Sequence, residues 1–416
     1  MPHDSCDWRV GVVLPLRFDE SRPGGTETVV RTFLRNLPKE RQSEIVVIGL
    51  GSVLGKSEYV DNFPFEGAFF GAFPVSRSLH ARIPARPQFA LGIVNRATAL
   101  RALRIGLVYA HTPESALAMS IALPNTPTVL HAHGVDNPLR LARFRWARTG
   151  LFRSSYETLV RRGAYRRASR VIVTCDRAQY ETHAARWGPA IARKFIRIPS
   201  MVDTSDFRPM DSGAIRKSLG FATDEFVWVC VGRMERPKGF DLLLETMAIL
   251  AGRGYRVRLL LVGDGSERLR LERQARTLGL ASQVRFHGQA ERSEMPRLLN
   301  AGNGYLSASW REGFSVAILE AMACGLPAVT TDFGGAKEVV REGVTGFVSE
   351  SRDPESLAER CEMLIRMDAD ALRRQCLEMA RTYDAVTVTA RIMSVLDSVR
   401  KPQRSSRLAA LQGTIA

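Results

Sequence analysis

The sequence predicts an α/β protein made of two Rossmann-like domains that face each other across a cleft. Short runs of β-forming residues alternate with helix-like stretches from residue 9 onward, a pattern typical of parallel sheets covered by helices. The alternation restarts after MVDTSDFRPM, residues 201–210. A chain of 416 residues is also long enough to bury two hydrophobic cores.

Six candidate strands are found in each half of the chain, each bounded by turn residues or by a helix-like segment. Those of the first half are residues 9–16, 44–50, 105–111, 128–134, 170–176 and 194–200. Those of the second half are residues 226–232, 257–263, 283–288, 304–309, 326–332 and 346–348. We therefore place the domains at residues 1–203 and 204–380, followed by a helix at 381–400 that crosses back to the first domain and a flexible tail at 401–416.

The N-terminus MPHDSCDWRV has acids where a signal peptide needs a basic segment and an apolar run. No apolar stretch approaches the roughly 20 residues that span a bilayer. We therefore expect a cytoplasmic protein. Its six cysteines are scattered without CxxC spacing, which argues against a disulfide framework or a zinc knuckle.

The formal net charge of +16 comes almost entirely from the first 200 residues, which hold 29 basic and 15 acidic side chains. The densest part, residues 139–170, has ten arginines against one acid, interleaved with aromatic and aliphatic residues. Such a segment suits an anionic membrane surface or an anionic acceptor. The alternative is a solvated helix face whose arginine stems cover apolar atoms. The candidate surface residues are Arg140, Arg143, Arg145, Arg148 and Arg153.

Two cations follow the first predicted strand of the second half, in the sequence GRMERPKGFDLLLE. Arg233 and Lys238 lie in the turn between that strand and a helix, an arrangement that suits a pyrophosphate. The alternative is an exposed turn that happens to be basic. The turn contains neither a Walker GKS or GKT sequence nor GxGxxG, so a phosphate would be held in another way.

The stretch WREGFSVAILEAMACGLP, residues 310–327, contains a predicted helix from Val316 to Ala323, with Ser315 as its N-cap. One carboxylate, Glu312, lies in the loop before this helix, and a second, Glu320, lies within it. Glu320 lies in an apolar run, where a buried carboxylate is costly unless polar groups contact it. The Glu320 carboxylate would suit the two hydroxyls of a ribose as hydrogen-bond donors. The alternative is a partly exposed helix acid.

The loop before this helix carries Glu312 and Gly313, and the glycine permits a close approach of a ligand. The free amides of Phe314, Ser315 and Val316 at the start of the helix can receive a phosphate oxygen.

Taken in order, these motifs resemble the family 4 retaining glycosyltransferases, which have the glycosyltransferase-B fold and use nucleotide sugars. Glu312 and Glu320 match the E-x7-E motif of the family. The resemblance extends over roughly residues 9–395 and includes Pro-Gly-Gly at 23–25, LVYAHTP, VLHAHG, VGRMERPKGFDLLLE, LLLVGDGSERLRLE, VRFHG and EGFSVAILEAMACGLPAVTTDFGGAKEVV. It makes the first domain the acceptor side and the second the nucleotide-sugar-binding side.

The resemblance implies a role for each matching residue. Arg233 and Lys238 would bind the donor diphosphate in place of a metal ion, and Glu320 would hold the ribose. Glu312 would contact the donor sugar, and His133 would be the catalytic histidine of the first domain. The remaining donor-site residues implied by the family are Gly24, Gly25, Gly232, Gly263, Phe286, His287, Gly288, Gly313, Phe314, Ser315 and Val316.

We therefore expect a metal-independent retaining glycosyltransferase that moves a hexose from a nucleoside diphosphate sugar by front-face internal return. The acceptor would be a lipid-linked or other glycan in cell-envelope or exopolysaccharide synthesis. Peripheral association with the inner face of an anionic membrane is expected, no cofactor beyond the donor is needed, and no nucleic acid is expected. Alternatives are a same-fold transferase with a soluble polyol or sugar-phosphate acceptor, a sugar-nucleotide epimerase, and a non-catalytic anionic-surface binder.

Overall fold

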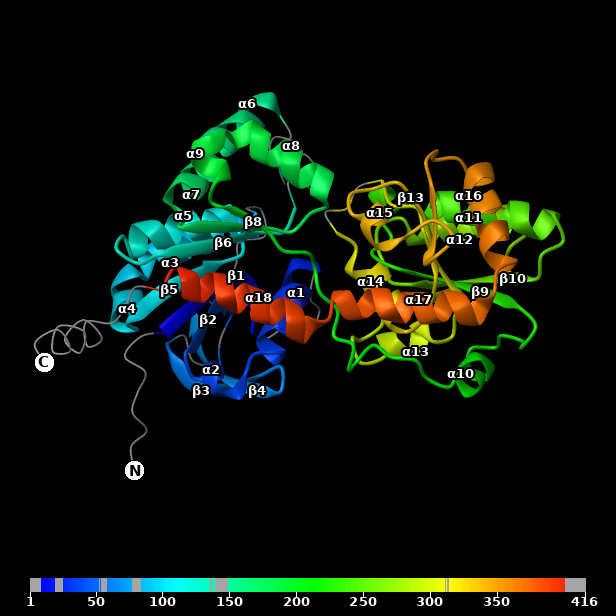
Figure 1. Cartoon of the computed structure of the whole chain (residues 1–416), viewed down its shortest axis with the longest axis horizontal. Coiled ribbons are helices and arrows are strands. Elements are labelled where there is room, and N and C mark those ends of the chain that lie inside the picture. Colours follow the sequence, from blue (N-terminus) through cyan, green and yellow to red (C-terminus); the bar gives the residue numbers. More distant parts are fainter. Residues whose placement is uncertain are drawn as a thin grey trace, which may run out of the picture. The chain divides into compact units, whose positions relative to one another are not determined.

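The computed structural model describes residues 9–18, 25–51, 53, 58–76, 84–134, 137, 139, 149–310, 312 and 314–400. The chain divides into two compact units, which are drawn together in Figure 1. Unit 1 comprises Met1–Val173, Thr182–Ile198 and Thr389–Ala416, and unit 2 comprises Thr174–Glu181 and Pro199–Val388.

Unit 1 is built on an eight-stranded sheet in the order β3-β4-β2-β1-β5-β6-β7-β8. Neighbouring strands are parallel except β3 and β4, which form an antiparallel hairpin at one edge. The strands are β1 (Arg9–Arg17), β2 (Ile45–Leu50), β3 (Val60–Phe65), β4 (Ala68–Pro74), β5 (Ile105–Ala110), β6 (Thr128–Ala132), β7 (Arg170–Val173) and β8 (Phe195–Arg197).

Helices flank this sheet and connect its strands. They are α1 (Gly25–Arg35), α2 (Lys39–Gln42), α3 (Ala85–Asn95), α4 (Ala97–Ala102), α5 (Pro113–Ala122), α6 (Gly150–Ser155), the π-helix η3 (Tyr156–Arg161), α7 (Arg162–Arg167), α8 (Arg177–Trp187) and α9 (Pro189–Ala192). The last helix, α18 (Ala385–Ser398), ends in unit 1, where Asp397 pairs with Arg41 at 2.9 Å. None of the helices described is both long and apolar enough to span a bilayer.

The β3–β4 hairpin is absent from the strands predicted from the sequence. Its two turn residues, Glu66 and Gly67, have φ angles of 54° and 77°, as a two-residue hairpin turn requires. The strand β3 contains Asp61, Asn62 and Pro64, residues that β-sheets disfavour, and Asp61 and Asn62 are exposed at the sheet edge. An edge strand of this composition lacks the apolar run by which the other strands were predicted.

Unit 2 is built on a six-stranded parallel sheet in the order β11-β10-β9-β12-β13-β14. Its strands are β9 (Phe226–Val231), β10 (Val257–Val262), β11 (Val284–Gly288), β12 (Gly304–Ser307), β13 (Ala328–Thr331) and β14 (Gly346–Ser349). Its helices are α10 (Ser212–Ser218), the 3-10 turn η4 (Arg236–Lys238), α11 (Phe240–Gly252), α12 (Arg268–Thr277), α13 (Met295–Leu299), α14 (Val316–Ala323), α15 (Ala336–Val339), α16 (Pro354–Ile365) and α17 (Ala369–Thr382).

Both faces of the second sheet are buried. Along β9, Val227 and Val229 belong to one hydrophobic cluster, whereas Trp228 and Cys230 belong to the cluster on the opposite face. This alternation places successive side chains in two different cores, as expected for a parallel sheet covered by helices on both sides. The α/β class and the two mainly parallel sheets predicted from the sequence are thus confirmed.

Candidate functional site

The direction of the chain across the second sheet reverses at β9. After β9 the chain adds β10 and then β11 on one side, and it returns to the other side of β9 with β12. Open α/β sheets bind ligands at the carboxyl ends of their strands at such a reversal. Arg233 and Lys238 follow β9, and Glu312 follows β12, so unit 2 brings three predicted site residues to this position.

Lys238 and Glu312 are in direct contact. The Nζ atom of Lys238 lies 2.8 Å from Oε1 of Glu312, and the same oxygen accepts a hydrogen bond from the Ser309 hydroxyl at 2.6 Å. The side chains of Lys238 and Glu312 are 31% and 15% exposed. A lysine ammonium has three donor hydrogens, so this pairing leaves donors of Lys238 for a ligand. Ser309 is not among the site residues predicted from the sequence.

The backbone around Lys238 is held tightly against the loop after β12. Gly239 has a φ of +64°, and a Cβ on it would lie 2.2 Å from the carbonyl oxygen of Ala308, so only glycine fits there. The amide of Trp310 also donates a hydrogen bond of 2.8 Å to the carbonyl of Pro237. These contacts fix the distance between the turn that carries Lys238 and the loop that carries Glu312.

Arg233 is exposed beside this pair. Its guanidinium contacts Glu235 at 3.0 Å, and its side chain is 77% exposed. An exposed pair of this kind contributes little to stability. The Arg233 guanidinium can therefore turn toward a bound anion at small cost.

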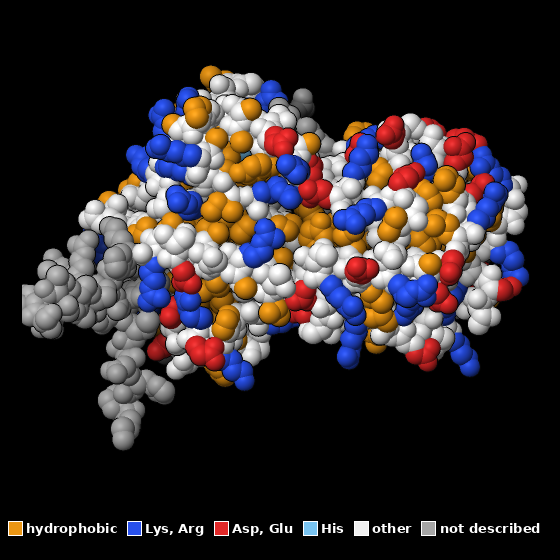
Figure 2. All heavy atoms as spheres, viewed as in Figure 1, with side chains coloured by type: hydrophobic (Ala, Val, Ile, Leu, Met, Phe, Trp, Pro, Cys, Tyr) orange, Lys and Arg blue, Asp and Glu red, His pale blue; other side chains and the backbone are white. Residues whose placement is uncertain are grey.

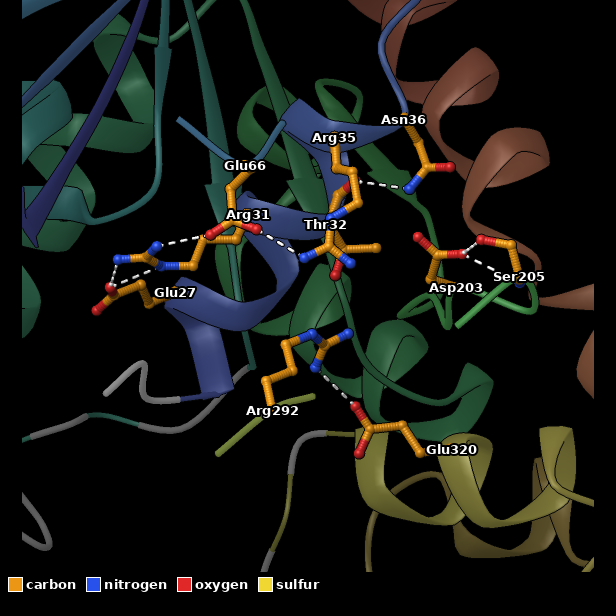
Figure 3. A network of polar contacts seen from close by, with 10 residues as sticks. All are labelled: Glu27, Arg31, Thr32, Arg35, Asn36, Glu66, Asp203, Ser205, Arg292 and Glu320. Atoms are coloured by element: carbon orange, nitrogen blue, oxygen red, sulfur yellow. Dashed lines mark hydrogen bonds and ion pairs between the residues drawn. The ribbon is translucent and has the colours of Figure 1, made fainter. Parts of the chain in front are cut away.

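Glu320 is buried on α14 and faces an arginine that is not among the residues predicted from the sequence. Arg292 donates a hydrogen bond of 3.0 Å to Glu320, as Figure 3 shows, and the Glu320 side chain is only 8% exposed. The Arg292 guanidinium also lies over the Phe207 ring, 5.1 Å from its centre. Burial raises the pKa of Glu320, and the Arg292 charge partly offsets that rise. Of the two carboxylate oxygens, Arg292 contacts Oε1.

The start of α14 has the geometry expected of an anion site. Ser315 is at the N-cap position with an extended backbone, although its hydroxyl accepts no capping hydrogen bond. The amides of Phe314, Ser315 and Val316 donate to no described residue. Gly313, also predicted for this site, lies outside the described residues.

Three glycines predicted for the donor site lie side by side at the carboxyl ends of β9, β10 and β11. A Cβ on Gly263 would lie 2.0 Å from the carbonyl oxygen of Gly232, and the amide of Gly263 donates to the carbonyl of Gly288 at 2.8 Å. The register between β10 and β11 shifts between Phe286 and Gly288, at His287. The backbone at His287 is thereby freed from regular strand pairing.

In unit 1, His133 follows β6 and belongs to a cluster of three histidines. Its Nε2 lies 2.9 Å from Nδ1 of His111, and His131 contacts the Tyr109 hydroxyl at 2.7 Å. Burial lowers the pKa of all three, that of His133 to about 3, with the charge of Arg86 as a second cause for His133. These imidazoles are therefore neutral at physiological pH.

The three histidines are the one group among the described residues with ring nitrogens close enough for a metal ion, within 4.8 Å of one another. However, His131 and His133 are stacked, with ring centres 4.1 Å apart and an interplanar angle of 21°. Ring nitrogens that coordinate one ion must point at a common centre, whereas the lone pairs of stacked rings lie in nearly parallel planes. The geometry favours a hydrogen-bonded cluster.

Gly25 is the first residue of α1, and a Cβ on it would contact nothing within 4 Å. Its predicted partner Gly24 lies outside the described residues.

Of the arginines predicted for an acceptor or membrane surface, four lie outside the described residues: Arg140, Arg143, Arg145 and Arg148. Arg153 is exposed on α6. Arg161, in contrast, is 2% exposed and bonds to Glu157 and Tyr165, so this arginine of the basic segment has a structural role. On the face drawn in Figure 2, basic side chains over α6 to α9 are interrupted by apolar and acidic ones.

Comparison with known protein families identifies the family of the chain. A family model described as Glycosyl transferases group 1 matches residues 211–383, and a second, described as Glycosyltransferase Family 4, matches residues 23–206. The chain belongs to the family 4 glycosyltransferases. The first of the two matches contains all of Arg233, Lys238, Glu312 and Glu320.

Individual relatives of this glycosyltransferase match over part of their length. A D-inositol 3-phosphate glycosyltransferase from Actinosynnema mirum is 35% identical over 37% of this chain and 39% of its own. A phosphatidylinositol N-acetylglucosaminyltransferase component from Arabidopsis thaliana is 33% identical over 44% of this chain and 39% of its own. The match thus spans less than half the length of these curated relatives.

Solved structures share the fold over nearly the whole chain. Anabaena HepE, in complex with UDP and glucose, has a TM-score of 0.72 at 24% identity and covers 94% of this chain and 100% of its own. Sucrose-phosphate synthase from Thermosynechococcus elongatus has a TM-score of 0.77 at 19% identity and covers 94% and 99%. These similarities confirm the predicted two-domain fold.

Proposed function

We propose that the protein is a retaining hexosyltransferase that takes a nucleoside diphosphate sugar as donor and a lipid-linked or other glycan as acceptor. The observation that carries this proposal is the contact between Lys238 and Glu312 beside Arg233, at the reversal of the second sheet. Two cations and a carboxylate at that position match a diphosphate and the hydroxyls of a sugar. The UDP and glucose bound by HepE, which shares the fold, support the same donor class.

In the proposed reaction, the bond between the anomeric carbon and the diphosphate oxygen breaks while the acceptor hydroxyl attacks the same face of the sugar. The acceptor proton passes to the departing phosphate oxygen, so the diphosphate leaves protonated and no protein base is consumed. Arg233 and Lys238 offset the charge that grows on the diphosphate, which is electrostatic stabilisation of the transition state. Glu312 orients the sugar, and the α14 amides receive a phosphate oxygen.

The donor half of this proposal is tested by thermal stabilisation with UDP-, GDP- and ADP-sugars, followed by transfer or donor hydrolysis with and without EDTA. We expect one base to stabilise the protein and EDTA to have no effect, because two cations take the place of a metal ion. Donor binding that requires a divalent metal, or that survives both Arg233→Ala and Lys238→Ala, would contradict the site assignment.

The acceptor part of the proposal is supported by exposed residues of unit 1. Leu151, Phe152 and Leu159 on α6 and η3 are 77%, 48% and 69% exposed, close in sequence to the exposed Arg153. Exposed aromatic and aliphatic residues among arginines suit the interface of an anionic membrane. WaaG, described as a glycosyltransferase involved in lipopolysaccharide biosynthesis, shares the fold, and we propose an envelope or exopolysaccharide pathway on this basis.

Sedimentation with phosphatidylglycerol vesicles tests the membrane association. Binding should weaken in about 0.5 M salt, where charges are screened beyond a few ångströms, and in the Leu151→Ser/Phe152→Ser variant. Leu269→Ser is the matched control, because Leu269 is 73% exposed but lies on α12 in unit 2. No binding by the wild type, or equal binding by all three proteins, would count against a membrane-bound acceptor.

A second candidate has a soluble phosphorylated polyol as acceptor. The D-inositol 3-phosphate glycosyltransferases among the relatives favour it, since their names specify such an acceptor. The donor site and the mechanism would be the same. Transfer to D-inositol 3-phosphate in the absence of vesicles would distinguish this candidate from the first.

A further inference from the structure

A pocket of about 210 Å³ opens in unit 1 at a place equivalent to the donor site of unit 2. The first sheet reverses at β1, which has β2 on one side and β5 on the other. The pocket is lined by Leu16 at the end of β1, Gly25 and Glu27 on α1, Arg86 on α3 and Thr112 after β5. Each sheet thus has a candidate binding site at the point where its strand order reverses, which is where open α/β sheets bind ligands.

Arg86 is the one cation among the described residues that line this pocket. It lies in the first turn of α3, is half-buried, and has no hydrogen bond or ion pair with any residue described in the structure. Its charge lowers the pKa of His133, where burial is the larger cause. The Arg86 guanidinium therefore lies near the predicted catalytic histidine, and its donors are not used by the described part of the protein.

The carboxylate of Glu27 on the pocket wall does not neutralise Arg86. Arg31 donates two hydrogen bonds to Glu27, at 3.0 and 2.8 Å, and Arg31 and Arg35 both pair with Glu66. Figure 3 shows Arg31 between the two glutamates. These two arginines and two glutamates balance one another, so the Glu27 carboxylate is already paired and is not the counter-ion of Arg86.

We propose that this pocket binds a phosphate group carried by the acceptor, with Arg86 as its principal ligand. A guanidinium presents donors in a planar fork that matches two phosphate oxygens. The first amides of the eleven-residue helix α1 are at the pocket, and the space beside Gly25 is open, so the backbone can approach the same phosphate. The inference rests on the proposed function, in which the acceptor is a second substrate with a site of its own.

The phosphate can belong to a soluble sugar or polyol phosphate or to the headgroup of a lipid-linked acceptor. Both present the same group to Arg86, and the two sources differ only in what is attached. The proposed contact at the pocket is therefore the same for both, and the experiment distinguishes the soluble phosphate from the lipid headgroup.

The test measures the binding of inorganic phosphate by calorimetry in the presence of saturating UDP, which occupies the donor phosphate site. We expect wild type to bind phosphate, and Arg86→Gln to bind it at least about tenfold more weakly, because a charge-assisted hydrogen bond is lost. Arg86→Lys should retain part of the affinity. Arg193→Gln is the matched control, an exposed arginine next to the amino end of β8 in the same sheet, and should bind like wild type.

UDP affinity should be equal in all four proteins, which separates this inference from the donor assignment. If UDP binds but phosphate does not, or if Arg86→Gln binds phosphate as wild type does, the pocket assignment is wrong. A second arm compares D-inositol 3-phosphate with phosphatidylinositol vesicles, each against Arg86→Gln. If Arg86→Gln weakens the binding of D-inositol 3-phosphate alone, the acceptor is soluble. If it weakens the binding to vesicles alone, the acceptor is a lipid headgroup. If it weakens the binding of neither ligand, the proposal is wrong.

Discussion

The ammonium group of Lys238 lies 2.8 Å from the Glu312 carboxylate, although 74 residues separate them in the chain. The contact depends on the strand order of the second sheet, in which β9 and β12 are neighbours while β10 and β11 lie on the other side. The family resemblance assigned Lys238 to the phosphates and Glu312 to the sugar. Their contact means that the position of each side chain depends on the other, so the two roles are coupled.

Replacing Lys238 by alanine should lower kcat by roughly 10²- to 10³-fold, as does the loss of one donor that stabilises a developing anion. It should also leave the Glu312 carboxylate without its cation, which disfavours an anionic donor. Steady-state transfer with the best donor from the sugar screen measures this. Arg236→Ala is the control, because Arg236 lies in the same 3-10 turn with its side chain 81% exposed. Similar losses in both variants would contradict a specific role of Lys238.

Substitutions of Glu320 and Glu312 should affect different properties, donor affinity and kcat respectively. Glu320→Gln removes the charge that a ribose diol would contact, so donor affinity should fall by about 1.5–3 kcal/mol, the range for hydrogen bonds to charged groups. Glu312→Gln should mainly lower kcat, because the proposed role of Glu312 is to contact the sugar, the reacting part of the donor. Titration with UDP and with the intact UDP-sugar distinguishes the two outcomes. Equal effects of both variants on UDP affinity would show the division to be wrong.

Part of the predicted donor site can be located from the sequence, because several of its residues lie in turns or loops that come after a strand. Arg233, Lys238 and Glu312 could be placed from the β9 and β12 segments alone. Arg292 could not, because it meets Glu320 only through packing of the turn before α13 against α14. The apolar run around Glu320 did indicate that a buried partner was needed, but nothing local identifies which residue provides it.

The fold shows the same distinction. Strands buried on both faces are runs of Val, Ile and Leu that can be recognised one at a time. The β3–β4 hairpin depends on a Glu-Gly turn and on pairing at an edge, and its exposed strand carries polar residues and a proline. Strand order is a property of the whole sheet, so the reversal points that position both candidate sites could be located only in the structure.

The hydrogen bond between His111 and His133 should fix which nitrogen of His133 carries the proton. Both imidazoles are neutral because burial lowers their pKa. Nε2 of His111 is buried and has no partner among the described residues. A buried N–H without an acceptor is rarer than a bare acceptor, so we expect His111 to donate from Nδ1, which leaves His133 protonated at Nδ1. His133 would then offer a donor to the substrate.

Two-bond nitrogen–proton correlation spectra report this tautomer directly. His111→Phe should give a mixture of His133 tautomers and lower kcat about fivefold to tenfold, the value of one hydrogen bond near 1 kcal/mol. Tyr109→Phe is the control, since Tyr109 contacts His131 and should leave the His133 tautomer unchanged. A His133 spectrum that is the same in wild type and His111→Phe would rule out the positioning role.

Unit 1 should lose stability as the pH falls below about 6.5, the ordinary pKa of histidine. His183 is 3% exposed, and burial, followed by the charges of Arg161 and Arg186, lowers its pKa to about 3. Between these pH values the unfolded chain binds a proton that the folded chain does not, so the free energy of unfolding falls by about 1.4 kcal/mol per pH unit for this residue. Denaturant unfolding followed by hydrogen exchange in unit 1 at pH 7.5 and 5 measures the loss. His183→Phe should reduce it by about 2 kcal/mol, and an equal loss in both proteins would show that His183 does not remain neutral in the folded state.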